Sequence, residues 1–136
     1  MISFNYETEF KLQNEDEITK WLSSVIAEEK FNEGEVNYIF CNDEYLVKLN
    51  IEFLNHNTLT DIISFDYTMG KQINGEIYIS IERVRENAVD FNVDFETELR
   101  RGMVHGILHY CGYKDKTERH QAEIRLKENY YIQQVS

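Results

Sequence analysis

The sequence predicts an α/β (α+β) domain in which a small mixed sheet of about four strands packs with about five helices. One observation supports this fold class, and a second supports a single domain. Segments of alternating hydrophobic and polar residues are interspersed with segments of helical periodicity along the chain. The 136 residues also contain no proline, no internal repeat and no Gly/Ser-rich linker that would mark a domain boundary. We therefore expect residues 1–136 to form one domain.

The first half of the chain is predicted to form a strand, a helix, a second strand and a second helix. Hydrophobic and polar residues alternate over Ile2–Tyr6 and again over residues 35–41, which is typical of strands with one buried face. Asn14 and Glu17 have the spacing of a capping box, so a helix is predicted behind them. Its apolar stripe consists of Ile18, Trp21, Leu22, Val25 and Ile26. The second helix begins near Asp43 and is expected to bury Leu46, Leu49 and Phe53.

The second half is predicted to contain two strands followed by three helices. Residues 61–67 and 75–80 are typical of strands, and the short polar turn between them favours antiparallel pairing. Ser80, Asp94 and Thr117 are candidate N-caps for the three helices. The middle helix is expected to end at Gly112, because glycine adopts the left-handed conformation that follows many helices.

Composition excludes several functional classes. The chain has no apolar run long enough for a membrane helix, and its start lacks the basic and small-residue pattern of a secretion signal. Two cysteines, Cys41 and Cys111, are too few for a disulfide framework, which favours a reducing cytoplasm. The net charge of −11 argues against a protein that coats nucleic acid. Residues 83–127, however, hold 9 basic and 8 acidic groups, so an anionic substrate can approach this third of the chain.

The histidines carry the strongest chemical signal. His105 and His109 are four residues apart in the helix predicted before Gly112, so their rings lie on one helix face, near enough to share a metal ion. Asp115 follows Gly112 by three residues, which gives the layout of a zincin-type site on a central helix. The residue after the first histidine is Gly106, where a His-Glu-x-x-His metallopeptidase has its general base. Peptide hydrolysis by that mechanism is therefore disfavoured.

Four motifs in this order resemble the YbeY family of bacterial metal-dependent endoribonucleases. The segment His105-Gly-Ile-Leu-His-Tyr-Cys-Gly-Tyr-Lys-Asp115 is similar to the family's His-Gly-x-Leu-His-Leu-x-Gly-Tyr-Asp-His signature. Upstream, Leu49-Asn50, Thr60-Asp-Ile-Ile-Ser-Phe65 and Gly75-Glu-Ile-Tyr-Ile-Ser80 match its other blocks, and Glu98 fits an acidic residue of the metal-site helix. The matching region covers roughly residues 36–115.

The resemblance implies a cytoplasmic bacterial enzyme that binds one Zn²⁺, or another divalent transition metal, and cleaves single-stranded RNA. It also implies a role in ribosomal RNA maturation, especially of the 3′ end of 16S rRNA, and in ribosome quality control beside ribosome-associated proteins. Asp61 and Ser64 would line the site. Arg100, Arg101, Lys114 and Lys116 are candidate RNA contacts because they flank the metal ligands in the sequence.

Two positions depart from the family pattern. The third metal ligand is usually histidine, whereas this chain has Asp115; the rival third ligand is His120, five residues later. Phe53-Leu54 stands where the family usually has Tyr-Arg, so an arginine that would stabilise phosphate charge is absent. His56, in the polar segment after Leu54, is interpreted as a solvated turn residue.

Three function classes therefore remain from the sequence. The first is a metal-dependent endoribonuclease. The second is a zincin-like metallopeptidase, which the histidine spacing favours and Gly106 opposes. The third is a ribosome-assembly factor whose metal is largely structural and whose activity is marginal, which Leu54 and the net charge permit.

Overall fold

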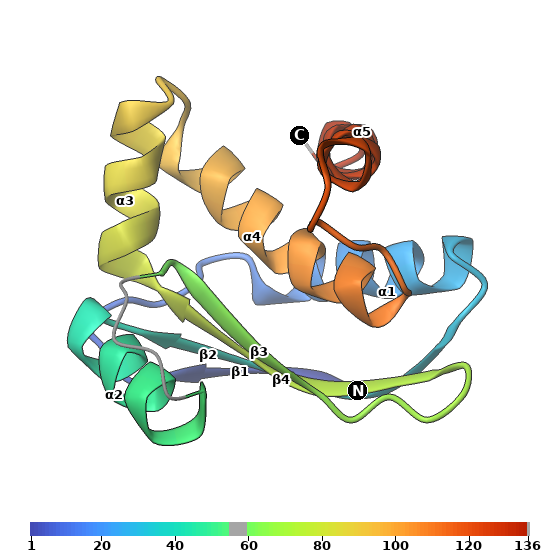
Figure 1. Ribbon diagram of the computed structural model, residues 1–136, viewed down its shortest axis with the longest axis horizontal. Helices are drawn as coiled ribbons and strands as arrows, with labels where there is room; N and C mark the ends of the chain where they lie inside the picture. Colours follow the sequence, from blue (N-terminus) through green and yellow to red (C-terminus); the bar gives the residue numbers. More distant parts are fainter. Residues whose placement is uncertain (55–59, 136) are drawn as a thin grey trace.

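A computed structural model describes residues 1–54 and 60–135, and these form one α/β domain (Figure 1). In the described residues, four strands make one sheet: β1 (Ile2–Tyr6), β2 (Asn32–Cys41), β3 (Ile62–Asp66) and β4 (Gln72–Ser80). Five helices surround it: α1 (Glu15–Glu28), α2 (Asp43–Leu54), α3 (Ile81–Asp90), α4 (Phe95–Tyr110) and α5 (Glu118–Gln133). The predicted fold class is confirmed.

The sheet is mixed, with the strand order β1-β2-β4-β3. β1, β2 and β4 are parallel, and β3 is antiparallel to β4, as the short connection between them predicted. β4 begins at Gln72 rather than Gly75 because Met69 and Gln72 exchange two main-chain hydrogen bonds of 3.0 and 2.9 Å. The turn is therefore tighter than the sequence suggested, and Gly70 occupies it with φ +59°.

Two hydrophobic layers cover the two faces of the sheet. On one face, α1 and α4 bury the side chains of alternate residues of β2 and β4, among them Val36, Tyr38, Phe40, Ile77 and Ile79. α5 lies above α4 on the side away from the sheet (Figure 1). On the other face, α2 covers a smaller cluster of Cys41, Leu46 and Ile63.

Several local predictions need correction. Phe53 is 59% exposed instead of buried, because it lies near the end of α2; its ring contacts that of Phe65 at 5.7 Å between centroids. Asn14 and Asp94 occupy N-cap positions, but neither side chain caps its helix; the Asn14 amide donates to Glu17 instead, at 3.5 Å. His56 and the side chain of Leu54 lie outside the described residues.

Ser80 and Thr117 do cap α3 and α5 through their hydroxyls, which accept hydrogen bonds from the N–H groups of Arg83 and His120. Among the described residues, no helix is both long and apolar enough to cross a membrane.

Glycines fix the height of α4 above the sheet. A Cβ at Gly106 would lie 2.7 Å from Cδ1 of Ile77, so the helix backbone rests directly on β4. One turn later, the Tyr110 ring occupies the space that a Cβ at Gly75 would fill, 2.5 Å from the ring carbon. The Tyr110 hydroxyl donates to the carbonyl oxygens of Phe65 and Glu76, at 3.0 and 3.1 Å. These contacts hold the turn that contains both histidines beside the centre of the sheet.

Candidate metal centre

His105 and His109 lie on the side of α4, as their spacing predicted. Their ring centroids are 4.5 Å apart with an interplanar angle of 81°, and their Nε2 atoms are 2.9 Å apart. Both side chains are mostly buried, with 24% and 28% exposed. The two nitrogen lone pairs therefore converge on one small volume at the surface of the helix.

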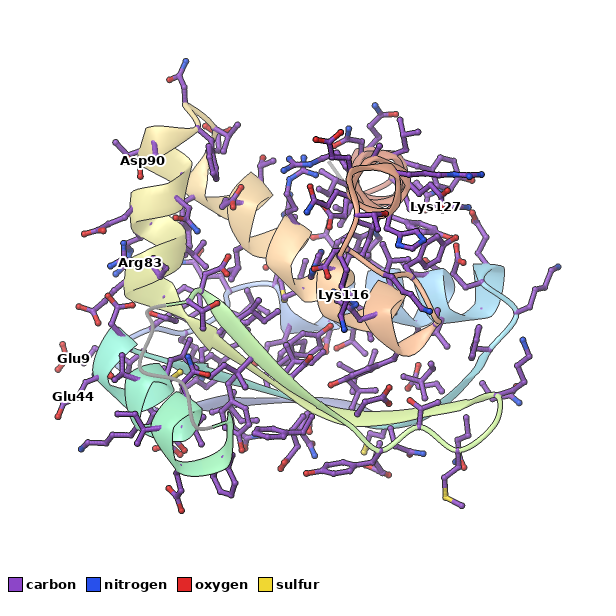
Figure 2. The ribbon with its side chains drawn as sticks, viewed as in Figure 1. Glu9, Glu44, Arg83, Asp90, Lys116 and Lys127 are labelled. Atoms are coloured by element: carbon purple, nitrogen blue, oxygen red, sulfur yellow. The ribbon has the colours of Figure 1, made fainter. Side chains whose placement is uncertain are left out.

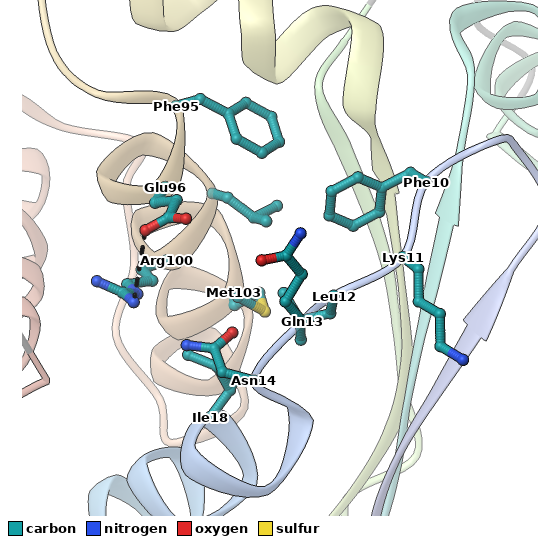
Figure 3. A pocket seen from close by; sticks show the side chains of 11 residues that line it. Phe10, Lys11, Leu12, Gln13, Asn14, Ile18, Phe95, Glu96, Arg100 and Met103 are labelled. Atoms are coloured by element: carbon teal, nitrogen blue, oxygen red, sulfur yellow. Dashed lines mark ion pairs between the residues drawn. The ribbon is translucent and has the colours of Figure 1, made fainter.

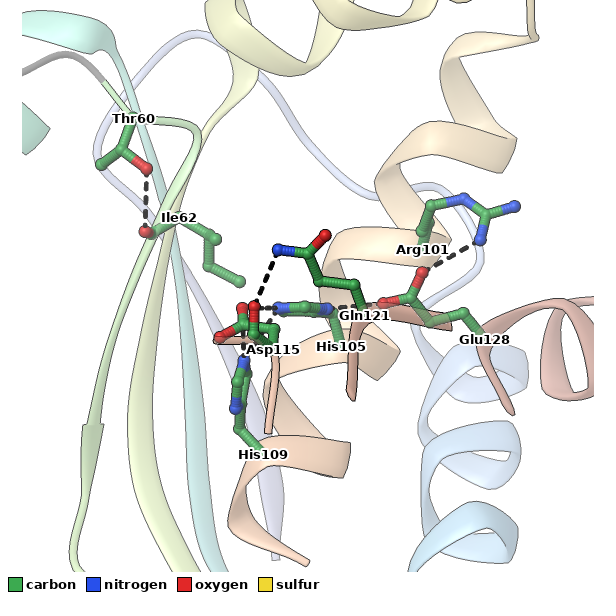
Figure 4. A network of polar contacts seen from close by, with 8 residues as sticks. All are labelled: Thr60, Ile62, Arg101, His105, His109, Asp115, Gln121 and Glu128. Atoms are coloured by element: carbon green, nitrogen blue, oxygen red, sulfur yellow. Dashed lines mark hydrogen bonds and ion pairs between the residues drawn. The ribbon is translucent and has the colours of Figure 1, made fainter. Parts of the chain in front are cut away.

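Asp115 reaches the same volume from the loop after α4. Gly112 has φ +101°, the left-handed conformation that turns the chain back along the helix. The Asp115 Oδ2 atom lies 3.2 Å from Nε2 of His109 and 3.6 Å from Nε2 of His105 (Figure 4). The amide of Gln121 donates to the main-chain oxygen of Asp115 at 3.0 Å, so α5 helps to hold the loop.

His105, His109 and Asp115, which we call the metal group, can together hold a divalent metal ion. Ligand atoms of a tetrahedral zinc, each about 2.0–2.1 Å from the ion, are roughly 3.3 Å from one another. The observed separations of 2.9, 3.2 and 3.6 Å lie around that value. Two imidazole nitrogens and one carboxylate oxygen are also a donor set that zinc accepts, and three protein ligands leave a position for water.

Behind His105, a buried carboxylate fixes the direction of the ring. His105 Nδ1 lies 2.5 Å from Oε2 of Glu128 on α5, whose side chain is only 5% exposed. The other oxygen of Glu128 accepts from Arg101 at 3.0 Å (Figure 4). Arg101 also donates to Asn129 at 2.8 Å. Because a carboxylate can only accept, Nδ1 carries the proton and Nε2 presents its lone pair to the metal group.

The charges around His105 and Glu128 agree with this arrangement. Burial disfavours the charged imidazole, but the hydrogen bond to Glu128 and the nearby Asp115 and Asp61 outweigh it and raise the pKa of His105. Burial likewise disfavours the Glu128 carboxylate, but His105 and Arg101 outweigh it and lower the pKa of Glu128. Glu128 is therefore ionised at neutral pH.

His105 and Asp115 of the metal group line a cleft of about 420 Å³. The start of β3, α3, α4 and α5 bound it, and Asp61, Asn87, Phe91, Glu98 and Arg125 are among its lining residues. Asp61, one of the residues predicted to line the site, accepts from the amide of Asn87 at 3.4 Å. Ser64 is exposed on β3, beside Tyr110.

The predicted RNA contacts fall in different places. Arg101 lines the cleft but is held by Glu128 and Asn129. Arg100 lies on another side of α4, in a separate cavity with Phe10 and Met103, where its closest carboxylate is Glu96 at 3.9 Å (Figure 3). Lys114 and Lys116 are exposed on either side of Asp115 in the sequence, in the loop before α5. Figure 2 shows Lys116 in this loop.

His120 lies outside the metal group. It lines another cavity together with Glu29, Cys111 and Tyr113, and its buried Nδ1 atom has no hydrogen-bond partner among the described residues. This placement favours Asp115 over His120 as the third ligand.

Sequence reasoning missed Glu128, because no local spacing connects it with a histidine 23 residues earlier. One signal was present. Ile124, Glu128 and Tyr131 recur at helical spacing and are all buried, so a carboxylate stands in the apolar stripe of the last helix. A charge at such a position requires a buried partner.

Comparison with known proteins places the chain in a family. The family model described as "Endoribonuclease YbeY" matches residues 2–136. Proteins named "Endoribonuclease YbeY" from Flavobacterium johnsoniae and Flavobacterium psychrophilum are 64% and 60% identical to it; each alignment covers 95% of this chain and 93% or 92% of the relative. The solution structure of a Thermotoga maritima protein is 30% identical, with a TM-score of 0.76 over 99% of this chain and 89% of that one. The chain belongs to the endoribonuclease YbeY family.

Proposed function

We propose that this protein is a metal-dependent endoribonuclease that hydrolyses phosphodiester bonds in single-stranded RNA. Membership of the family supports the activity. The observation that carries the proposal is the convergence of His105, His109 and Asp115 at one side of an open cleft. That geometry suits hydrolysis of a bond in a chain that can enter the cleft from solvent.

In this proposal, His105 Nε2, His109 Nε2 and Asp115 Oδ2 hold one Zn²⁺; another divalent transition metal is the alternative. When bound there, such an ion would polarise a phosphoryl oxygen and lower the pKa of water toward about 7. Glu128 and Arg101 keep the His105 ring in the orientation that the ion requires.

Hydrolysis bonds a water oxygen to phosphorus and breaks one P–O ester bond, so the water loses a proton and the departing oxygen takes one up, from the group that accepted it or from solvent. Gly106 cannot accept the proton of the water, and neither can Glu128, which is already bound to His105 and Arg101. Asp61 lines the cleft, and among the described residues its carboxylate accepts a long hydrogen bond of 3.4 Å from the amide of Asn87. We assign the proton-accepting role to Asp61. Arg125 lines the cleft and supplies positive charge there.

The biological setting follows from the family resemblance. The proposed substrate is ribosomal RNA, including the 3′ end of 16S rRNA, and the proposed partners are ribosome-associated proteins in the bacterial cytoplasm. The relatives with which the chain was compared come from bacteria.

One experiment separates this function from its two rivals. The zinc-loaded protein is incubated with labelled single-stranded RNA and, separately, with casein, each with and without a chelator. We expect cleavage of RNA alone, abolished by the chelator. Cleavage of casein would indicate a metallopeptidase. Metal-dependent thermal stability without turnover of either substrate would indicate an assembly factor with a structural metal.

A further inference from the structure

β3 has a free edge. The Ser80 N–H donates to the Asp61 oxygen and the Tyr67 N–H donates to the Asn74 oxygen, so the residues that bond to β4 are 61, 63, 65 and 67. The main-chain groups of Ile62, Ser64 and Asp66 therefore point away from β4, and of these the Ile62 carbonyl accepts from the Thr60 hydroxyl at 3.4 Å. β3 is the last strand in the order β1-β2-β4-β3, so no described strand pairs with those groups.

This edge runs past the metal group. Gly106 rests on Ile77, whose partner in β3 is Ser64, and Tyr110 rests on Gly75, whose partner is Asp66. His105 and His109 each precede one of these contact residues, so they lie level with Ser64 and Asp66. Ile62 lines the same cleft as His105 and Asp115, and Figure 4 shows its side chain directed toward them. The histidines thus lie on the side of α4 that the free edge borders.

We propose that the free edge of β3 binds the sugar–phosphate backbone of the RNA substrate, with the main chain of Ser64 hydrogen-bonded to a ribose 2′-hydroxyl. The inference rests on the proposed function and names a contact within the same site. A chain lying along this edge passes directly beside His105, His109 and Asp115.

The chemistry of the edge favours RNA. Every second residue presents one N–H donor and one C=O acceptor, with a repeat of about 6.7 Å along the strand. A 2′-hydroxyl is both a donor and an acceptor, and DNA lacks it. Neutral main-chain groups also suit a cleft that contains the carboxylates of Asp61, Glu98 and Asp115. The edge therefore contributes recognition that does not depend on a basic patch.

The test uses Ser64→Pro in the zinc-loaded protein. Proline removes the outward N–H of residue 64 but no hydrogen bond to β4, and edge strands tolerate such a proline. Ser64→Ala is the matched variant, because it loses the hydroxyl but keeps the N–H. Each protein is titrated with a single-stranded RNA and with versions carrying one 2′-deoxy nucleotide on either side of the cleavage site. Binding is read by stopped-flow anisotropy before cleavage, and kcat/KM is measured on the same substrates.

For the wild type and Ser64→Ala, we expect one deoxy substitution to weaken binding about tenfold, the value of one hydrogen bond. Ser64→Pro should bind the RNA about tenfold more weakly than the wild type. Its affinity should not fall further when the deoxy strand replaces the RNA. Equal sensitivity to the deoxy substitution in all three proteins would overturn the proposal.

A second measurement needs no variant. In the wild-type protein, the Ser64 amide should exchange hydrogen more slowly when RNA is bound, while a DNA strand should protect it less. Protection by an extended peptide but not by RNA would overturn the proposal and indicate pairing of a peptide with the edge strand. If the wild type fails to cleave RNA, the proposed function fails, but binding and amide exchange still decide whether the edge contacts a 2′-hydroxyl.

Discussion

His105 on α4 and Glu128 on α5 are joined by a hydrogen bond of 2.5 Å between Nδ1 and Oε2. The bond links the helix that carries two candidate ligands to the last helix of the chain. Arg101 holds the second oxygen of Glu128 at 3.0 Å, so the carboxylate is fixed on both sides. The geometry of the metal group therefore depends on Glu128, which bonds to the His105 nitrogen that points away from the group.

Removing Glu128 should weaken metal binding. We expect Glu128→Ala to lower zinc affinity about 10- to 100-fold, the usual effect of losing a partner of a ligating histidine. Glu128→Gln keeps an acceptor for Nδ1 and should lose less. Competition with a chromophoric chelator measures the affinities. Glu123→Ala, on an exposed part of the same helix, is the control; an equal loss there would show that α5 as a whole, rather than Glu128, is responsible.

The third ligand can be identified by substitution. Asp115→Ala should weaken zinc binding sharply, Asp115→His should retain the metal, and His120→Ala should bind normally, because only Asp115 lies within reach of both histidines. The double variant His105→Ala/His109→Ala should lose the metal altogether. Metal analysis of the purified proteins gives the occupancies. Normal zinc in Asp115→Ala together with loss in His120→Ala would establish His120 as the ligand.

The sequence predicted those parts of the molecule that local patterns determine. His105, His109 and Gly112 lie close together in the chain, so helix geometry and one left-handed glycine were enough to bring Asp115 near the histidines. The antiparallel pairing of β3 and β4 followed from their short connection for the same reason.

Contacts across the fold could not be predicted in this way. Glu128 and Arg101 meet only because α5 packs on α4, and Arg100 is separated from its neighbour Arg101 by the 100° turn of the helix. Phe53 follows the helical stripe of α2 but lies near the end of that helix, where it is exposed beside the ring of Phe65. These outcomes depend on packing rather than on periodicity.

Lys114 and Lys116 are the exposed cations nearest the metal group in the chain, and reversing their charge should weaken RNA binding. We expect Lys114→Glu/Lys116→Glu to reduce affinity and to lower the slope of log affinity against log salt by about 0.7 for each phosphate that the variant no longer neutralises. Lys48→Glu, an exposed change on α2 across the sheet, should leave both unchanged. Anisotropy titrations at several salt concentrations provide the slopes. An unaltered slope in the double variant would place the RNA path elsewhere.

Two glycines of α4 should respond oppositely to alanine. Gly106→Ala places a methyl group 2.7 Å from Ile77 Cδ1 and should destabilise the protein by about 1–3 kcal/mol. Gly102→Ala meets nothing within 4 Å and should stabilise it by about 0.5–1 kcal/mol, because alanine favours the helix. Urea unfolding measures both values. A neutral Gly106→Ala would mean that the Ile77 side chain moves aside for the methyl group without cost.

Glu98 should make stability depend on pH. Burial raises its pKa, and Asp61 and Glu128 add to the effect, although Arg101 and Arg125 oppose it. Since the folded-state pKa lies above the ordinary value of 4.5, this group's contribution to stability is fully present below pH 4.5. That contribution is lost as the pH rises through the folded-state pKa, so the ionised carboxylate destabilises the protein at neutral pH.

Glu98→Gln should therefore melt at a higher temperature than the wild type near neutral pH, and the difference should vanish as the pH falls toward about 4. Glu96→Gln, an exposed change on the same helical turn, should give a difference near zero throughout. Thermal melts of the metal-free proteins across this pH range make the comparison, and a lower melting temperature for Glu98→Gln at neutral pH would show that Arg101 and Arg125 outweigh burial.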